Sequence, residues 1–127
     1  MSSLKMEVFD LLEYAGKQDN WVIGSPIKVP VDSPGYSKSL QISYHYKEID
    51  HREEKFHYHT DGIEECYFVF EGSITLRIDK KDYRLSENQA IRVPPLKPHK
   101  IINFSDPVTY VTIRAPPSND NTTVKLE

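Results

Sequence analysis

From residue 39 onward, short stretches of alternating apolar and polar residues recur along the chain, separated by residues that favour turns. In the first of them, Leu40, Ile42 and Tyr44 alternate with Gln41 and Ser43. A period of two is typical of a β-strand that buries one of its faces. Roughly eight such stretches follow one another, with a turn about every eight to twelve residues. This spacing predicts an all-β sandwich or barrel and argues against a parallel α/β sheet.

The positions of the expected elements follow from the same pattern. Asp10 is expected to cap a short N-terminal helix that ends at Gly16. The stretches on either side of Glu71-Gly72 are expected to pair as a hairpin. We expect extended pieces or strands at about residues 21–23, 27–29, 39–47, 56–59, 65–70, 73–78, 83–85, 90–93, 99–104 and 109–114.

Length and composition predict one domain. The chain has 127 residues, of which 38% are hydrophobic and 28% charged, which suits one hydrophobic core. We expect a barrel core at about residues 38–114, an N-terminal segment at 1–37 and an arm or frayed tail at 115–127. The net charge of -3 argues against a nucleic-acid surface, and no apolar run is long enough to cross a membrane. The absence of a signal-peptide pattern predicts a cytoplasmic location, and the single cysteine, Cys66, allows no internal disulfide.

Two histidines that lie two positions apart point to a specific chemistry. His57 and His59 alternate with Phe56 and Tyr58, and these flanking residues favour a strand. Residues two apart share one face of a strand, so both imidazoles can point at the same place. Two glutamates follow within one short loop, and a third histidine, His99, comes later. Imidazole together with carboxylate is a common ligand set for first-row transition metals.

These residues resemble the two motifs of the cupin family. In the first motif a His-x-His pair precedes a glutamate and then a glycine, as His57, His59, Glu65 and Gly72 do here. The second motif resembles the run Pro94-Pro95-Leu96-Lys97-Pro98-His99, although Leu96 stands where the family has a glycine.

The resemblance covers about residues 40–114. It implies a double-stranded β-helix, that is, a jelly-roll barrel, which holds one divalent transition metal: Fe, Mn, Ni or Zn. The ligands that it implies are His57, His59, Glu65 and His99.

The glutamate ligand has two candidates, because the loop before it is one residue longer than the family pattern. Glu64 fits the spacing counted from His59, and Glu65 fits the spacing counted back from Gly72. Strand alternation favours Glu65, because it lies on the face opposite to the bulky Phe68 and so should point into the barrel. Glu64 stays as the alternative ligand.

Several other residues are candidates for the lining of a pocket. Tyr67 and Arg77 are candidates for catalytic roles, and Arg92 and Arg114 for orienting an anionic substrate. The interpretation that strand residues of these types favour on general grounds is a solvent-exposed position for each of them. Cys66 is expected to be a small buried hydrophobic residue and not a nucleophile.

Two further histidines and one asparagine are considered as residues of the site. His45 and His51 are expected to be ordinary surface or core residues, unless the face that His45 shares with Ser43 is the interior of the barrel. In that case His45 would line the pocket. Asn103 shares a strand face with His99 and is expected to support it.

Three classes of function are compatible with these residues. The first is a mononuclear metal-dependent enzyme, such as a dioxygenase, isomerase or lyase, acting on a small polar or anionic molecule. The second is a binding module that holds a small ligand without catalysis. The third, a metal-free epimerase or isomerase with a histidine acid/base pair, is disfavoured by the complete ligand set.

The resemblance also bears on assembly. Small barrels of this family present an open sheet edge and an apolar outer face, here at Phe68 and Phe70. We therefore expect a homodimer in which the segment around Trp21 or the tail after Arg114 crosses to the partner.

Overall fold

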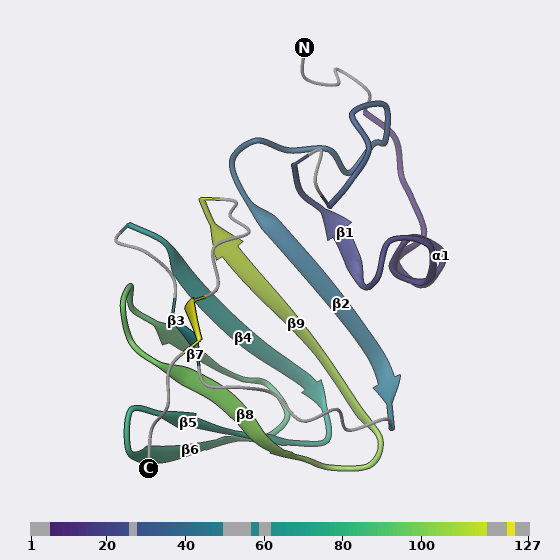
Figure 1. The fold of residues 1–127 in the computed structure, drawn as a ribbon. Coiled ribbons are helices and arrows are strands. Elements are labelled where there is room, and N and C mark those ends of the chain that lie inside the picture. Colours follow the sequence, from purple (N-terminus) through teal and green to yellow (C-terminus); the bar gives the residue numbers. More distant parts are fainter. Residues whose placement is uncertain (1–5, 26–27, 50–56, 59–61, 117–121, 124–127) are drawn as a thin grey trace.

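Two antiparallel sheets, packed face to face, make up most of the protein (Figure 1). The computed structural model describes residues 6–25, 28–49, 57–58, 62–116 and 122–123, and of His57, Thr122 and Thr123 the backbone alone. The elements are α1 (Leu11–Lys17), β1 (Trp21–Ile23), β2 (Gln41–Glu48), β3 (His57–Tyr58), β4 (Glu64–Glu71), β5 (Ile74–Ile78), β6 (Lys81–Leu85), β7 (Gln89–Val93), β8 (His99–Phe104), β9 (Val108–Ala115) and β10 (Thr122–Thr123).

Each sheet has five strands. One has the order β1-β2-β9-β4-β7 and the other the order β10-β3-β8-β5-β6. Some neighbours in the sheets, such as β2 and β9 or β3 and β8, are distant in the chain, as in a jelly roll, whereas β5 and β6 are consecutive. The helix α1 lies beside β1 and β2 at one end. The predicted all-β jelly-roll fold with a short N-terminal helix is thus confirmed. Within the part of the chain that the structure describes, no helix has the length and apolar character needed to cross a membrane.

The N-terminal helix begins where the sequence predicts. The Asp10 side chain accepts a hydrogen bond from the backbone N–H of Glu13 at 2.9 Å, which satisfies one of the free donors of the first turn. The prediction that Gly16 ends the helix is wrong, because the helix runs to Lys17, whose ammonium contacts Glu13 one turn earlier. The predicted extended piece at 27–29 is wrong for Lys28 and Val29, which lie in a turn.

The predicted hairpin around Glu71-Gly72 is also wrong. β4 pairs with β7 and β9, whereas β5 pairs with β6 and β8 in the other sheet. The chain crosses between the sheets at Gly72, whose φ of +78° lies in the left-handed region that favours glycine. A Cβ there would also lie 2.1 Å from the Ser105 hydroxyl, so this corner needs glycine for space as well. The predicted tail contains a short strand, β10, that pairs with β3.

The hydrophobic core fills only part of the space between the sheets. Ile74 and Leu76 of β5 are fully buried against Val69 of β4 and Val108 of β9. On β2 the pattern is reversed: the polar residues Gln41 and Ser43 are buried, and the apolar residues between and after them are only half-buried. The inner face of this sheet is therefore apolar toward one end and polar toward the other, where a ligand site can form.

Candidate functional site

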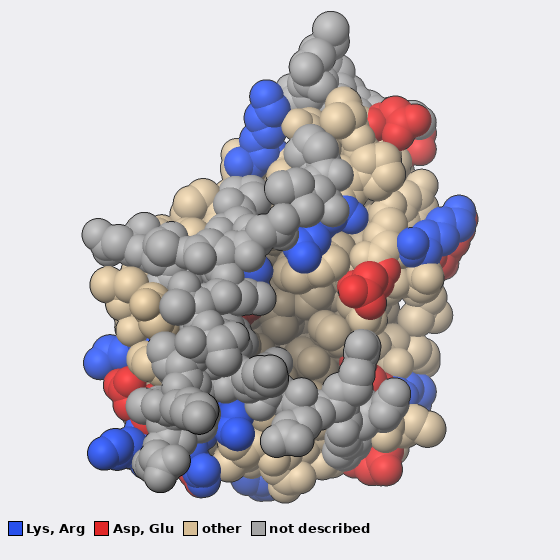
Figure 2. Space-filling view, viewed as in Figure 1, with Lys and Arg blue, Asp and Glu red and all other residues tan. Residues whose placement is uncertain are grey.

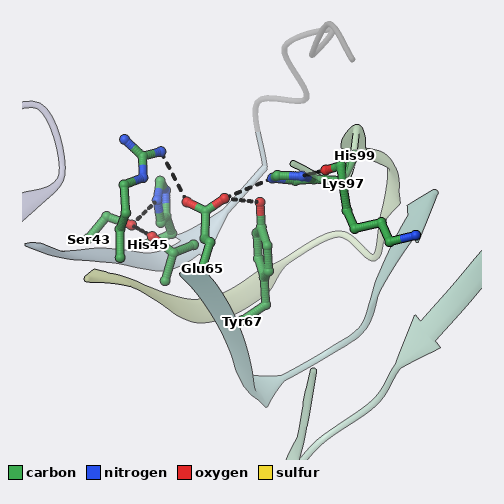
Figure 3. A network of polar contacts seen from close by, with 8 residues as sticks. Ser43, His45, Glu65, Tyr67, Lys97 and His99 are labelled. Atoms are coloured by element: carbon green, nitrogen blue, oxygen red, sulfur yellow. Dashed lines mark hydrogen bonds and ion pairs between the residues drawn. The ribbon is translucent and has the colours of Figure 1, made fainter. Parts of the chain in front are cut away.

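A buried carboxylate, that of Glu65, is the centre of the polar interior. Glu65 is 3% exposed and lies near the start of β4. Its Oε1 accepts a hydrogen bond from the Tyr67 hydroxyl at 3.1 Å and lies 2.9 Å from Nε2 of His99. Its Oε2 accepts a hydrogen bond from Nη2 of Arg114 at 3.0 Å. Figure 3 shows Tyr67 and His99 both directed at this carboxylate. A buried carboxylate is tolerated only with such partners, so the cluster is a built polar site.

The alternation of β4 separates the two glutamates that the sequence left as candidates. Glu65 points inward with Tyr67, whereas Glu64 is on the outer face, where its Oε1 lies 3.1 Å from Nη1 of Arg92. The Glu64 and Arg92 side chains are 44% and 59% exposed, so this ion pair is a surface contact of small energetic value. Of the two carboxylates, Glu65 alone lies beside His99.

His99 is held with one ring nitrogen directed at Glu65. It begins β8 directly after the proline-rich loop and is 1% exposed. Nδ1 lies 2.8 Å from the backbone carbonyl of Lys97. A carbonyl can only accept, so Nδ1 donates to it, and Nε2 is the ring nitrogen that faces the Glu65 carboxylate. An imidazole nitrogen and a carboxylate this close together are a pair of ligands that suits a first-row transition metal.

The two other expected ligands lie at the edge of what the structure describes. The backbone register of β3 and β8 pairs His57 with His99. The side chain of His57, and His59 as a whole, lie outside the described residues. Among the residues that are described, no three His, Cys, Asp or Glu side chains gather as a metal site. Of the four expected ligands, the structure thus describes the side chains of two, Glu65 and His99.

Positive charge gathers beside the carboxylate. Arg114 lies on β9 and is 6% exposed, and its guanidinium carbon lies 5.6 Å from the centre of the Trp21 ring. The ammonium of Lys28 lies 5.2 Å from the centre of the same ring. Burial, followed by the charge of Arg114, lowers the pKa of Lys28 below its ordinary value. The positive charges of Arg114 and Lys28 repel one another, and a bound anion would reduce this repulsion.

Figure 2 shows that the surface is hollowed over β2 and β9 when the molecule is seen from the same side as in Figure 1. The inner residues of β2 and β9 include Gln41, Ser43 and Thr112, each buried and polar. Sequence reasoning named His45 as a pocket residue only conditionally and did not name Thr112. The signal was present, because the polar residues of β2 recur with the strand period and must all share one face.

Two of the predicted supporting residues lie elsewhere. Arg77 is on the outer face of β5, where it forms two contacts with the Asp82 carboxylate at 2.6 and 3.0 Å, so we assign it no part in the site. Asn103 is exposed, although it shares the nominal parity of His99. The reason is an irregularity in the pairing of β5 with β8 between Thr75 and Leu76, which reverses the alternation before Asn103.

Cys66 is half-buried on the outer face of β4. Burial raises the pKa of its thiol above the ordinary value, and the charge of Glu64 adds to this, while Arg92 opposes it. At pH 8.5 we therefore expect iodoacetamide to alkylate Cys66 several-fold more slowly in the native protein than in urea, because the thiolate is the reactive form. Mass spectrometry against time would measure both rates, and equal rates would contradict the assignment.

Comparison with known proteins identifies a family that this chain matches. The family model of the cupin domain matches residues 48–114. An uncharacterized protein of Methanocaldococcus jannaschii is 31% identical over 65 residues, which are 50% of this chain and 52% of that protein. The chain thus spans about half the length of this curated relative.

Solved structures show the same fold. A protein from Planctomyces limnophilus superposes with a TM-score of 0.53 at 26% identity, over 66% of this chain and 70% of that one. Pac13, a nucleoside dehydratase from Streptomyces, superposes with a TM-score of 0.56 at 17% identity, over 71% of this chain and 72% of that one. The family match extends over more than half of the chain and includes both segments from which the Glu65 and His99 side chains meet, so the chain belongs to the cupin domain family.

Proposed function

We propose that this protein is a mononuclear metal-dependent enzyme that acts on a small anionic molecule, by a lyase or isomerase type of reaction. The observation that carries the proposal is the contact between the Glu65 carboxylate and Nε2 of His99 in a buried, polar interior. The carbonyl of Lys97 accepts a hydrogen bond from Nδ1 of His99, so Nε2 is the ring nitrogen that faces the Glu65 carboxylate.

The proposed ligands are His57, His59, Glu65 and His99. The backbone pairing of His57 with His99 supports the first of them, and the position of His59 two residues further on supports the second. A divalent ion bound there would act as a Lewis acid toward an oxygen atom of the substrate. Tyr67 would hold the Glu65 carboxylate in place through its hydroxyl.

The proposed substrate class follows from the charges around the carboxylate. Arg114 and Lys28 both lie close to the Trp21 ring, and a substrate that carries a carboxylate or phosphate would relieve their mutual repulsion. Elimination is the reaction type that we favour over oxidation, since Pac13, which shares the fold, is a dehydratase.

Metal content tests the proposal. Elemental analysis of the purified protein is expected to find about one transition-metal ion per chain, and a His57→Ala, His59→Ala double variant is expected to retain less than a tenth of it. Glu64→Gln serves as a matched control and should keep the wild-type content, because Glu64 points away from the site. A double variant with full metal content would show that the ligand assignment is wrong.

A further inference from the structure

A second polar cluster lies on the inner face of β2 and β9. Nδ1 of His45 lies 2.6 Å from Oε2 of Glu48, and Nε2 of His45 lies 3.1 Å from Oγ of Ser43. The Ser43 hydroxyl also contacts the hydroxyl of Thr112 on β9. The order carboxylate, imidazole, hydroxyl is the arrangement by which proteins prepare a hydroxyl group for proton transfer.

The chemistry of the three groups shows which of them donates each hydrogen bond. The Glu48 carboxylate can only accept, so Nδ1 of His45 donates to it. In the neutral imidazole Nε2 then has a lone pair, and the Ser43 hydroxyl donates to that lone pair. The imidazole thus directs its basic nitrogen at Ser43. When this nitrogen takes a proton, the Glu48 carboxylate can stabilise the imidazolium that forms.

The backbone is deformed in a way that builds this pair. Residues three apart on a regular strand point to opposite faces, so His45 and Glu48 would not meet. The pairing of β2 with β9 is interrupted between these two residues, and Lys47 has a φ of +47°. The bulge brings Glu48 back to the side of His45. The His45 ring is fixed further by Tyr110, with ring centres 4.3 Å apart and planes inclined by 3°.

The cluster lies directly beside the Glu65 site. Strand register places Ser43 opposite Thr112 and Thr112 opposite Tyr67, in one row across β2, β9 and β4. Two strand spacings separate Ser43 from Tyr67, about 10 Å between backbones, and their side chains share the inner face. Figure 3 shows Ser43 and His45 on one flank of Glu65.

The exposure of the cluster falls from the surface to the interior. The side chains of Glu48 and His45 are 25% and 17% exposed, whereas Ser43 is 3% exposed. One end of the cluster therefore reaches water, and the other end reaches the polar interior. A chain of groups with this gradient can carry a proton between a buried substrate and the solvent.

We propose that Glu48, His45 and Ser43 form a proton relay that removes a proton from a carbon atom of a substrate bound between Ser43 and Glu65, a location that rests on the proposed function. Ser43 Oγ takes the proton from carbon as its own proton passes to Nε2 of His45. The electron pair of the broken C–H bond forms a double bond, and the leaving group departs with its own electron pair. The imidazolium, held by Glu48, then gives the proton to the leaving group or to water.

The relay is testable before the natural substrate is known. The probe is 5-nitrobenzisoxazole, which loses a proton from a ring carbon as its N–O bond breaks to give a coloured phenolate. In EDTA-treated protein, His45→Asn is expected to lower kcat roughly 100-fold, the usual contribution of a general base. Glu48→Gln is expected to lower kcat roughly tenfold with little change in KM, since Glu48 positions the base. Glu64→Gln, which alters a carboxylate on the outer face of β4, should leave the rate unchanged.

Two further variants separate chemistry from structure. Imidazole added to His45→Ala should restore a large part of the lost rate, which a purely structural role would not allow. Ser43→Ala should lose the rate as His45→Asn does, and a Ser43→Ala variant with the wild-type rate would overturn the relay through the hydroxyl. Melting curves show which variants fold. If His45→Asn does not fold, the comparison is made between Glu48→Gln and Glu64→Gln.

The outcome is independent of the metal. A wild-type rate no higher than that of His45→Asn would overturn the relay, even in a protein with full metal content. Conversely, a protein that binds no metal but eliminates the probe through His45 would support the relay and contradict the proposed metal site.

Discussion

Replacing Glu65 with glutamine is expected to lower the free energy of unfolding by about 3–5 kcal/mol, measured by urea denaturation in EDTA. Glutamine keeps the size of the side chain but removes the negative charge that Arg114 contacts at 3.0 Å, and the Arg114 side chain is only 7% exposed. A buried guanidinium that loses its counter-charge is costly, because the protein interior solvates it poorly. The melting temperature should fall by roughly 10 °C or more for a domain of this size.

Glu64→Gln is the matched control for this experiment. The two glutamates are adjacent on β4, but Glu64 pairs with Arg92 on the exposed face. We expect a change of less than about 1 kcal/mol, because solvent screens exposed ion pairs. The Glu65 assignment would be contradicted if the two variants lost the same stability.

Metal binding is expected to stabilise the protein by about 4 kcal/mol when the free metal is a thousand times its Kd. The expected ion would bind the native state, in which Glu65 and His99 lie together, because the unfolded chain does not hold these residues in place. The melting temperature of the metal-loaded protein should therefore exceed that of the EDTA-treated protein by roughly 10 °C or more.

The double variant His57→Ala, His59→Ala controls for metal bound elsewhere. Its melting temperature should be the same with metal and with EDTA, since half of the proposed ligand set is missing. A shift as large as that of the wild-type protein would place the stabilising metal at another site. No shift in the wild-type protein, with one ion bound per chain, would mean that metal binding and folding are uncoupled.

The period-two pattern was the part of the sequence that predicted most. It located β2, β4, β8 and β9 to within a few residues, because alternation of side chains on a half-buried strand is a local property. The same alternation favoured Glu65 over Glu64 as the inward carboxylate, and the structure directs Glu65 inward. Where a bulge interrupts the alternation, as before Asn103, parity counted along the chain failed.

Strand pairing was beyond the reach of local patterns. The stretch around Glu71-Gly72 has the signs of a hairpin, yet β4 and β5 belong to different sheets. Which strands pair depends on how the whole chain buries its apolar faces, and β4 lies between β7 and β9. The short strand β10 was missed for a related reason, because two polar residues become a strand only where a partner such as β3 is available.

The sequence by itself determined the family and the all-β class, because these depend on residue type and spacing. The metal ligands stay a prediction from the sequence. The tertiary structure alone decided that Arg114 faces Glu65 and that Glu48 turns back to His45. The first contact joins residues on different strands, and the second requires a bulge in β2. Both are set by the register between strands, which arises only when the sheets assemble.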